Sequence, residues 1–220
     1  MEVRSLSEIP LHNTDLVLLD LDNTLYEYQK CHEKALQAIT DIIHAQLGTN
    51  REEVRALYME CRKIVNKHHH GTAASHSRLF YLQAMVEKLC SRTDAELISL
   101  LYKSYWDMFM DEMILFPDAQ HFLDTCLSRK IPIVLVTDMT TEIQFKKIKK
   151  LNIGKFFQFI VTSEEAGAEK PDPFIFEMAI AKAKTIYEIK NIVVVGDDKR
   201  KDIWTPDVYI VNCYHISVSN

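Results

Sequence analysis

The sequence predicts an α/β fold, a Rossmann-like parallel sheet with helices on both faces, together with an inserted α-helical bundle. Two observations lead to this prediction. From about residue 117 onward, short apolar segments alternate with amphipathic helical segments, an order that is typical of a parallel sheet. Residues 27–110, in contrast, carry one helical pattern after another.

The first element is a strand at residues 15–20. It contains the apolar run 16–19, which ends at Asp20. Uninterrupted apolar strands are expected when helices cover both faces of a sheet. We therefore expect this early strand to lie in the same sheet as the later strands.

The helical stretch predicts four helices joined by short loops, which form a small bundle. Apolar residues recur in it at spacings of three and four. Asn50 with Glu53, and Thr93 with Glu96, have the spacing of capping boxes. These pairs are expected to begin the second and the fourth helix.

The remaining elements follow in the order β-α-β-α-β. The expected strands are 131–136, 159–162 and 192–195, and the expected helices are 142–150 and 173–184. The lysine pairs 146–147 and 149–150 suggest a phosphate or nucleic-acid site, but a solvated helix face is the favoured interpretation. The simplest domain organisation is a core of residues 1–24 and 116–220 with a helical cap of residues 25–115.

Composition and charge exclude several classes of protein. The chain has 220 residues, 47% of them apolar and 26% charged, as in ordinary soluble globular proteins. A net charge of −5 gives no electrostatic basis for binding nucleic acid or an anionic membrane. The apolar run before Asp20 is too short for a signal peptide or a membrane span.

The cysteines and the histidine run are interpreted as ordinary structural or surface residues. The five cysteines show no C-x-x-C spacing, which predicts reduced thiols in a cytoplasmic protein. The run His68-His69-His70 is expected at a solvated helix end, because three consecutive residues cannot share one helix face for a metal.

Candidate functional residues follow all four predicted strands. Ligands of open parallel sheets bind outside the carboxyl ends of the strands. The polar and charged residues at or beyond these ends are Asp20 and Asp22, Thr137 and Asp138, Lys170, and Asp197, Asp198 and Asp202.

This set predicts phosphoryl chemistry. Five carboxylates are expected to converge near Lys170, and two carboxylates about 4 Å apart repel by about 4 kcal/mol at an effective dielectric constant of 20. Oxygen ligands of this kind suit Mg²⁺, particularly when a substrate phosphate completes its shell. One carboxylate can attack phosphorus and form an aspartyl phosphate. A second, two residues on, can act as general acid and then as general base.

The same residues, in the same order, resemble the haloacid dehalogenase-like hydrolase superfamily over the whole chain. The run Asp20-Leu21-Asp22-Asn23-Thr24 is similar to the first motif, D-x-D-x-T. Thr137 is similar to the second motif, and Lys170-Pro171 to the third. Residues 196–202 are similar to the fourth motif, G-D-x-x-x-x-D. The helical insertion is similar in placement to the C1 cap of this family.

The resemblance implies a role for each residue. Asp20 would be the nucleophile and Asp22 the general acid and base. The carboxylates of Asp20 and Asp197 and the backbone carbonyl of Asp22 would hold Mg²⁺. The substrate phosphate would be bound by Thr137, Asp138 and Lys170, and supporting roles would fall to Asp198 and Asp202.

Two departures from the family pattern are present. Asp138 stands where Asn is common, either as an extra acid near the phosphate or as the cap of a helix beginning near Thr141. The run 203–207 replaces a helix of small residues and contains no glycine. The last helix and strand are therefore left unassigned.

The resemblance implies a reaction but not a substrate. Because the dehalogenase branch lacks an acid at the position of Asp22, we expect a Mg²⁺-dependent phosphatase of a small phosphorylated metabolite, a sugar phosphate or a nucleotide. Residues 136–176 look most like the nucleotidase and acylneuraminate-phosphate phosphatase branches. A phosphomutase and an inactive phosphate-binding protein are the alternatives, and no oligomeric state is predicted. The candidate specificity residues are Tyr26, Tyr28, His68–His70, His76, Arg78 and Tyr81.

Overall fold

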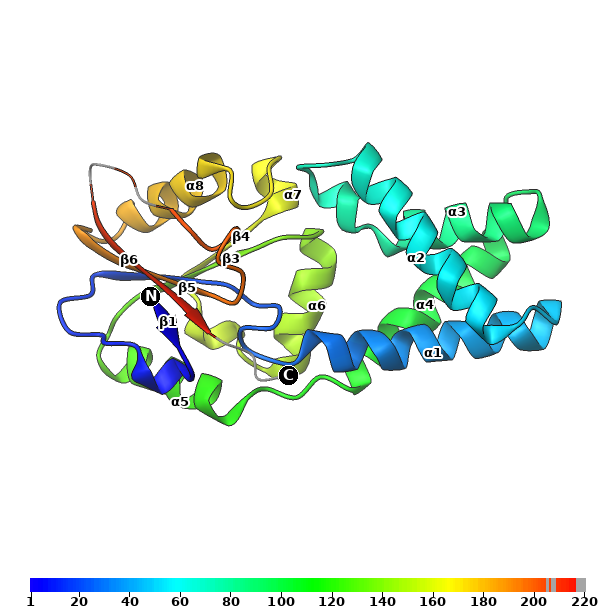
Figure 1. Ribbon diagram of the computed structural model, residues 1–220. Helices are drawn as coiled ribbons and strands as arrows, with labels where there is room; N and C mark the ends of the chain where they lie inside the picture. Colours follow the sequence, from blue (N-terminus) through cyan, green and yellow to red (C-terminus); the bar gives the residue numbers. More distant parts are fainter. Residues whose placement is uncertain (205, 207–208, 217–220) are drawn as a thin grey trace. The chain divides into compact units, whose positions relative to one another are not determined.

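The computed structural model describes residues 1–204, 206 and 209–216. The chain divides into two compact units (Figure 1). The α/β unit comprises Met1–Glu27 and Ile114–Asn220, and the helical unit comprises Tyr28–Met113. The interpretation of these units as a catalytic core and a cap stays a prediction.

The α/β unit is built on a six-stranded parallel sheet, which confirms the predicted fold class. Its strand order is β1-β6-β5-β2-β3-β4. The central strand β2 places Leu18 beside Val134 of β3 and Val194 of β5. The strands are β1 (Glu2–Val3), β2 (Leu16–Leu19), β3 (Ile133–Thr137), β4 (Phe159–Thr162), β5 (Asn191–Gly196) and β6 (Ile210–Ile216).

Helices cover both faces of this sheet, as predicted. Figure 1 shows α8 (Pro173–Lys184) on one face and α5 (Pro117–Ser128) and α6 (Thr141–Leu151) on the other. All residues of β2 and β3 are buried. On the α8 side, Phe176 and Ile180 belong to one apolar cluster with the sheet. Burial of both faces explains why these strands are apolar throughout.

The helical unit consists mainly of four helices, which confirms the predicted bundle. They are α1 (Tyr28–Leu47), α2 (Arg51–His68), α3 (Arg78–Cys90) and α4 (Ala95–Asp111). Its core is rich in aromatic rings, with Tyr58, Tyr105 and Phe109 fully buried. Tyr105 stacks on Phe109 at a ring-centroid distance of 6.1 Å.

One of the two expected helix caps is wrong. Asn50 does cap α2, and its side chain accepts from the backbone N–H of Glu52. The cap of α4, however, is Asp94 rather than Thr93, because the Asp94 carboxylate accepts from the backbone N–H of Leu97 at 3.0 Å. A carboxylate at this position also interacts favourably with the positive end of the helix dipole. The hydroxyl of Thr93 donates to Glu87 instead.

Several elements lie outside the sequence prediction. The short strand β1, the helix α5 and the single-turn helix α7 (Ser163–Ala166) were not assigned. The strand β6 is the last strand, which the sequence analysis left unassigned, and it pairs with β5 from Ile210 to His215. Within the departure at 203–207, residues 205 and 207 lie outside the described residues.

The cysteines and the histidine run agree with the sequence interpretation. All five cysteines carry free thiols, and Cys31, Cys61 and Cys126 are buried. His68 and His70 are exposed at the end of α2, while His69 stacks on Phe80. None of the helices in the described part of the chain is both long and apolar enough to cross a membrane.

Candidate functional site

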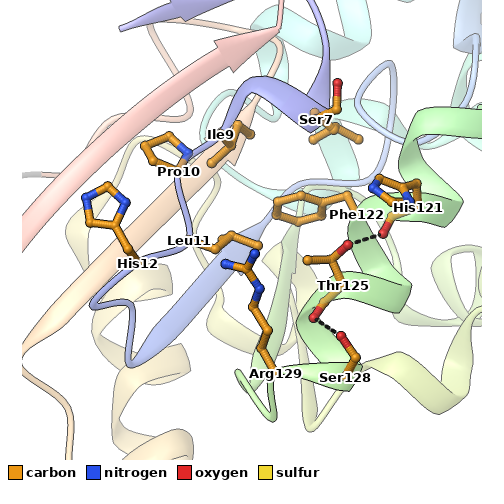
Figure 2. A pocket seen from close by; sticks show the side chains of 11 residues that line it. Ser7, Ile9, Pro10, Leu11, His12, His121, Phe122, Thr125, Ser128 and Arg129 are labelled. Atoms are coloured by element: carbon orange, nitrogen blue, oxygen red, sulfur yellow. Dashed lines mark hydrogen bonds between the residues drawn. The ribbon is translucent and has the colours of Figure 1, made fainter.

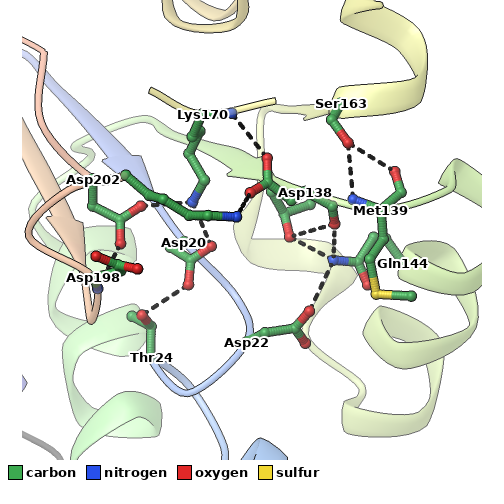
Figure 3. Close-up of polar contacts among 12 residues, drawn as sticks. Asp20, Asp22, Thr24, Asp138, Met139, Gln144, Ser163, Lys170, Asp198 and Asp202 are labelled. Carbon is green, nitrogen blue, oxygen red and sulfur yellow. Dashed lines mark hydrogen bonds and ion pairs between the residues drawn. The ribbon is translucent and has the colours of Figure 1, made fainter. Parts of the chain in front are cut away.

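The candidate site lies at the carboxyl ends of three adjacent strands of the α/β unit. Asp20 follows β2, Thr137 ends β3, and Asp197 follows β5. The three strands run parallel, so their ends meet at one edge of the sheet. Figure 3 shows the polar contacts among the side chains gathered there.

Lys170 joins two buried carboxylates. Its ammonium donates to Oδ1 of Asp20 and to Oδ1 of Asp202, both at 2.6 Å. All three side chains are at most 8% exposed. The hydroxyl of Thr24 donates to the other oxygen of Asp20 at 2.9 Å. The carboxylate of Asp20 is therefore fixed on both sides by hydrogen bonds.

Asp197 completes a cluster that could hold a metal ion. One carboxylate oxygen from each of Asp20, Asp197 and Asp202 lies within 4.8 Å of the others. Burial and the neighbouring carboxylates of Asp202 and Asp197 raise the pKa of Asp20, although Lys170 works in the opposite direction. Burial and Asp202 raise the pKa of Asp197 to about 6. One ammonium therefore does not balance three carboxylates, and the all-oxygen donor set suits a hard divalent cation.

The close packing of this cluster requires a glycine at the end of β5. A Cβ atom on Gly196 would lie 2.1 Å from the carboxyl carbon of Asp202. The second oxygen of Asp202 also accepts from the backbone N–H of Asp198 at 3.0 Å. The Asp202 carboxylate thus occupies the space that a side chain at position 196 would fill.

Asp22 forms a separate group with residues of α6. The ammonium of Lys147 donates to both oxygens of Asp22, at 2.7 and 2.8 Å. The hydroxyl of Tyr26 also donates to Asp22, and Gln144 donates to it at 3.3 Å. Burial works to raise the pKa of Asp22, but the charge and the hydrogen bonds of Lys147 outweigh it and the pKa is lowered.

The solvated-face interpretation of the lysine pairs is wrong for Lys147. Its side chain is 0% exposed, whereas Lys146 beside it is exposed and pairs with Glu142. The buried residues of α6 are Ile143, Gln144, Lys147 and Ile148. Gln144 and Lys147 thus stand on the apolar stripe of the helix, and polar residues at such positions were the signal that could have revealed them.

The expected convergence of five carboxylates on Lys170 is also wrong. Three converge there, and Asp22 pairs with Lys147 instead. The carboxylate of Asp198 accepts from the backbone N–H and the guanidinium of Arg200, at 2.9 to 3.2 Å. Asp198 closes a local turn because its side chain reaches a backbone N–H two residues on. Its contacts with Asp202 come from its backbone, whose N–H donates to the Asp202 carboxylate and whose carbonyl accepts from the Asp202 N–H.

Thr137 and Asp138 lie between these two groups. The Thr137 hydroxyl is buried and accepts from Gln144. The Asp138 carboxylate accepts from the backbone N–H of Lys170 at 3.0 Å and from the ammonium of Lys201 at 2.7 Å. It does not cap α6, whose N-cap residue is Thr140. Lys201 is thus a second cation near the candidate site that the sequence interpretation did not include.

The candidate specificity residues fall into both units. Tyr26 belongs to the α/β unit and is fully buried against Asp22. Arg78 is 4% exposed within the helical unit, where its guanidinium lies 5.7 Å from the ring centres of Tyr28 and Tyr81. It also donates to the carbonyl of His76 at 2.7 Å. These contacts give Arg78 and its neighbours a packing role in the helical unit.

A surface pocket of about 660 Å³ lies at the opposite edge of the sheet (Figure 2). Leu11 and His12, which precede β2, line it together with Ser128 and Arg129, which precede β3. These residues lie at the amino ends of the strands. The pocket is therefore separate from the candidate site.

The chain is similar to a known protein family and to named phosphatases. A family model described as haloacid dehalogenase-like hydrolase matches residues 14–205. The ribulose-1,5-bisphosphate 5-phosphatase of Halopiger xanaduensis is 33% identical over 85% of this chain and 78% of its own length. The glyceraldehyde 3-phosphate phosphatase of Methanopyrus kandleri is 31% identical over 85% of this chain and 77% of its own length.

A solved structure shares the fold. The crystal structure described as a HAD phosphatase from Thermococcus onnurineus superposes with a TM-score of 0.69. It covers 92% of this chain and 93% of its own chain, at 17% sequence identity. At this identity the likeness concerns the fold alone.

Proposed function

Because this chain belongs to the haloacid dehalogenase-like hydrolases and is a phosphatase, we propose that it hydrolyses a small phosphomonoester through an aspartyl phosphate on Asp20, with Mg²⁺ as cofactor. One observation carries the proposal. Asp20 is a buried carboxylate held by Thr24 and Lys170 beside two further carboxylates. A carboxylate fixed in this way suits a nucleophile, and Lys170 supplies a positive charge for an anionic phosphoryl group.

The first half of the reaction transfers the phosphoryl group to the protein. An oxygen of Asp20 forms a bond to phosphorus while the bond from phosphorus to the ester oxygen breaks. The contacts of Asp22 favour its ionised form, so Asp22 must take up a proton before the ester bond breaks. It gives this proton to the departing oxygen, and the product leaves as an alcohol. Lys170 and the hydroxyl of Thr137 stabilise the charge on the phosphoryl oxygens.

The second half of the reaction releases the phosphoryl group from Asp20 and regenerates the free protein. Asp22, now a carboxylate, takes a proton from a water molecule that attacks the phosphorus. The bond between Asp20 and phosphorus breaks, and inorganic phosphate leaves. Asp20 is again a carboxylate and Asp22 again carries its proton, so the cycle is balanced.

The metal ion fits the residues present. Asp20 and Asp197 would hold Mg²⁺ together with the backbone carbonyl of Asp22, and Asp202 would orient Lys170 beside it. When bound, Mg²⁺ supplies the positive charge that the three clustered carboxylates and the phosphate lack. The cluster within 4.8 Å, with only one ammonium against it, supports this assignment.

The substrate class is a phosphorylated sugar or a nucleotide, and the relatives favour a sugar. The two named above act on ribulose-1,5-bisphosphate and on glyceraldehyde 3-phosphate, according to their names. Both names describe phosphatases, which favours hydrolysis over a phosphomutase and over an inactive phosphate-binding protein. The helical unit would act as the cap that selects the substrate.

The test uses purified protein and a panel of sugar phosphates, triose phosphates and nucleoside monophosphates, with an aryl phosphate as a general probe. Phosphate release should require Mg²⁺ and should stop in Asp20→Asn. Release of one phosphate for each substrate molecule consumed would distinguish hydrolysis from a mutase. Unchanged turnover in Asp20→Asn would contradict the nucleophile assignment.

A further inference from the structure

We propose that Lys147 is a positioning residue for the reaction, which together with Tyr26 and Gln144 holds the carboxylate of Asp22 where it exchanges a proton with the departing oxygen. This inference rests on the proposed function and adds to it a residue outside the four sequence motifs. The burial of Lys147 and the contacts that converge on Asp22 support it.

The burial of Lys147 calls for an explanation. Its side chain is 0% exposed, and removing an ammonium from water costs several kcal/mol unless a partner compensates. Replacing a buried ion pair by apolar residues is often neutral or stabilising. An apolar pair at positions 22 and 147 could therefore have been as stable, so stability alone does not explain this ion pair.

The partner of Lys147 is the acid that the reaction needs. Lys147 lies within 2.8 Å of both oxygens of Asp22, a contact that constrains the carboxylate in position and in rotation. Tyr26 donates to one of these oxygens and Gln144 to the other. Three side chains thus fix one carboxylate.

Asp22 nevertheless remains accessible. Its side chain is 24% exposed, in contrast to the complete burial of Lys147. The contacts of Asp22 in Figure 3 come from the α6 side, through Gln144, and are separate from those of Asp20. A carboxylate that these contacts hold and that is still partly exposed can meet a substrate oxygen or a water molecule.

Helix α6 links this group to the phosphate side of the site. Gln144 and Lys147 are three residues apart, so they lie on the same face of the helix. The same amide nitrogen of Gln144 that reaches Asp22 also lies near the hydroxyl of Thr137 and 2.8 Å from the carbonyl of Asp138. The helix therefore relates the position of the acid to the residues proposed to bind phosphate.

The experiment compares leaving groups. An aryl phosphate with a highly acidic phenol departs without a proton, whereas an alkyl phosphate needs one. The value of kcat/KM reports the steps up to departure of the alcohol. It is measured for 2,4-dinitrophenyl phosphate and for the best alkyl phosphate of the substrate panel, in the wild type, Lys147→Met and Asp22→Asn.

We expect Lys147→Met to lower kcat/KM by about 10- to 100-fold for the alkyl phosphate, which is part of the roughly 100- to 10,000-fold that a general acid contributes. The loss should be less than about threefold for the aryl phosphate. In the Asp22→Asn background, Lys147→Met should have little further effect, because both changes act on one function. The matched control is Lys146→Met, an exposed neighbour that should change neither value. Tyr26→Phe removes a single donor to Asp22 and should also lower kcat/KM for the alkyl phosphate more than for the aryl phosphate. This second variant keeps the test valid if Lys147→Met folds poorly.

The outcomes separate the two proposals. Turnover in Asp20→Asn would overturn the proposed function. If Asp20→Asn is inactive and Asp22→Asn discriminates between the leaving groups, equal losses on both substrates in Lys147→Met and Tyr26→Phe would overturn the positioning role alone. If Asp22→Asn does not discriminate, both the acid assignment and the role of Lys147 are wrong.

Discussion

At residue 196 the chain has no room for a side chain, because Asp202 lies against the backbone there. Asp202 is held by Lys170 at 2.6 Å and by the N–H of Asp198 at 3.0 Å, so it cannot move without losing contacts. The glycine of the fourth motif therefore has a steric reason in this chain.

Gly196→Ala should lower the free energy of unfolding by about 1–3 kcal/mol, as overpacking of a tight site does. It should also lower phosphatase activity at temperatures where the variant is fully folded, because Asp202 and Lys170 must separate. Denaturant unfolding and kcat measure the two effects. The control is Gly154→Ala, whose added Cβ would meet Ile148 at an ordinary 3.5 Å. Equal behaviour of the two variants would contradict this steric argument.

At the same scale, the sequence predicts most of the charged cluster but not the surroundings of Asp22. Asp20, Lys170, Asp197 and Asp202 stand at strand ends, where topology alone brings them together. Lys147 stands in mid-helix, and its burial depends on the packing of α6 against the loop after β2. Neighbouring lysines in one run do not reveal which of them faces inward unless the apolar stripe is traced through them.

Among the elements, prediction succeeds where a segment is long or uniformly apolar. The expected ranges 159–162 and 173–184 coincide with β4 and α8. The helix α5 has apolar residues at 119, 122, 123 and 126, a helical spacing that was available in the sequence. The two residues of β1 are too few to carry a pattern, and their pairing with β6 is a long-range contact.

The packing of α1 against α4 makes the helical unit sensitive to pH through His32. Its ring nitrogen Nδ1 lies 2.7 Å from the Tyr105 hydroxyl, and the side chain is 3% exposed. Burial, assisted by the charge of Arg62, lowers the pKa of His32 from 6.5 to about 4. Between these two values the unfolded chain binds a proton that the folded chain does not.

The free energy of unfolding should therefore fall as the pH drops from 6.5 to 4, by up to about 3 kcal/mol from this residue, and should show no further loss from it below pH 4. His32→Gln should remove this part of the slope, while His70→Gln, at an exposed position, should leave it unchanged. Urea unfolding followed by the helical circular dichroism signal at several pH values measures this. The same slope in His32→Gln and in the wild type would exclude His32 as its source.

For the whole molecule, the carboxylate cluster predicts that Mg²⁺ stabilises the folded chain independently of turnover. At about 100 times its dissociation constant, a bound ion adds about 2.7 kcal/mol, which corresponds to a rise in Tm of roughly 5–10 °C for a chain of this size. Calorimetry with and without Mg²⁺ measures the increment.

Asp197→Asn should lose most of this increment, whereas Asp198→Asn should keep it, because the Asp198 carboxylate pairs with Arg200. The two positions are adjacent in the sequence and differ in their contacts, which makes them a matched pair. An increment that survives in Asp197→Asn would place the ion elsewhere.

The order of the strands in the sheet also determines when the parts of this protein can form during synthesis. β2 lies between β3 and β5, both of which are made much later. The helical unit, in contrast, is one continuous segment, so all the residues that form its internal contacts are present once residue 113 has emerged. Asp20 is translated early, and its partners Lys170 and Asp202 arrive only after the whole helical unit. A nascent chain therefore holds its proposed nucleophile for most of translation without the residues that would make it reactive.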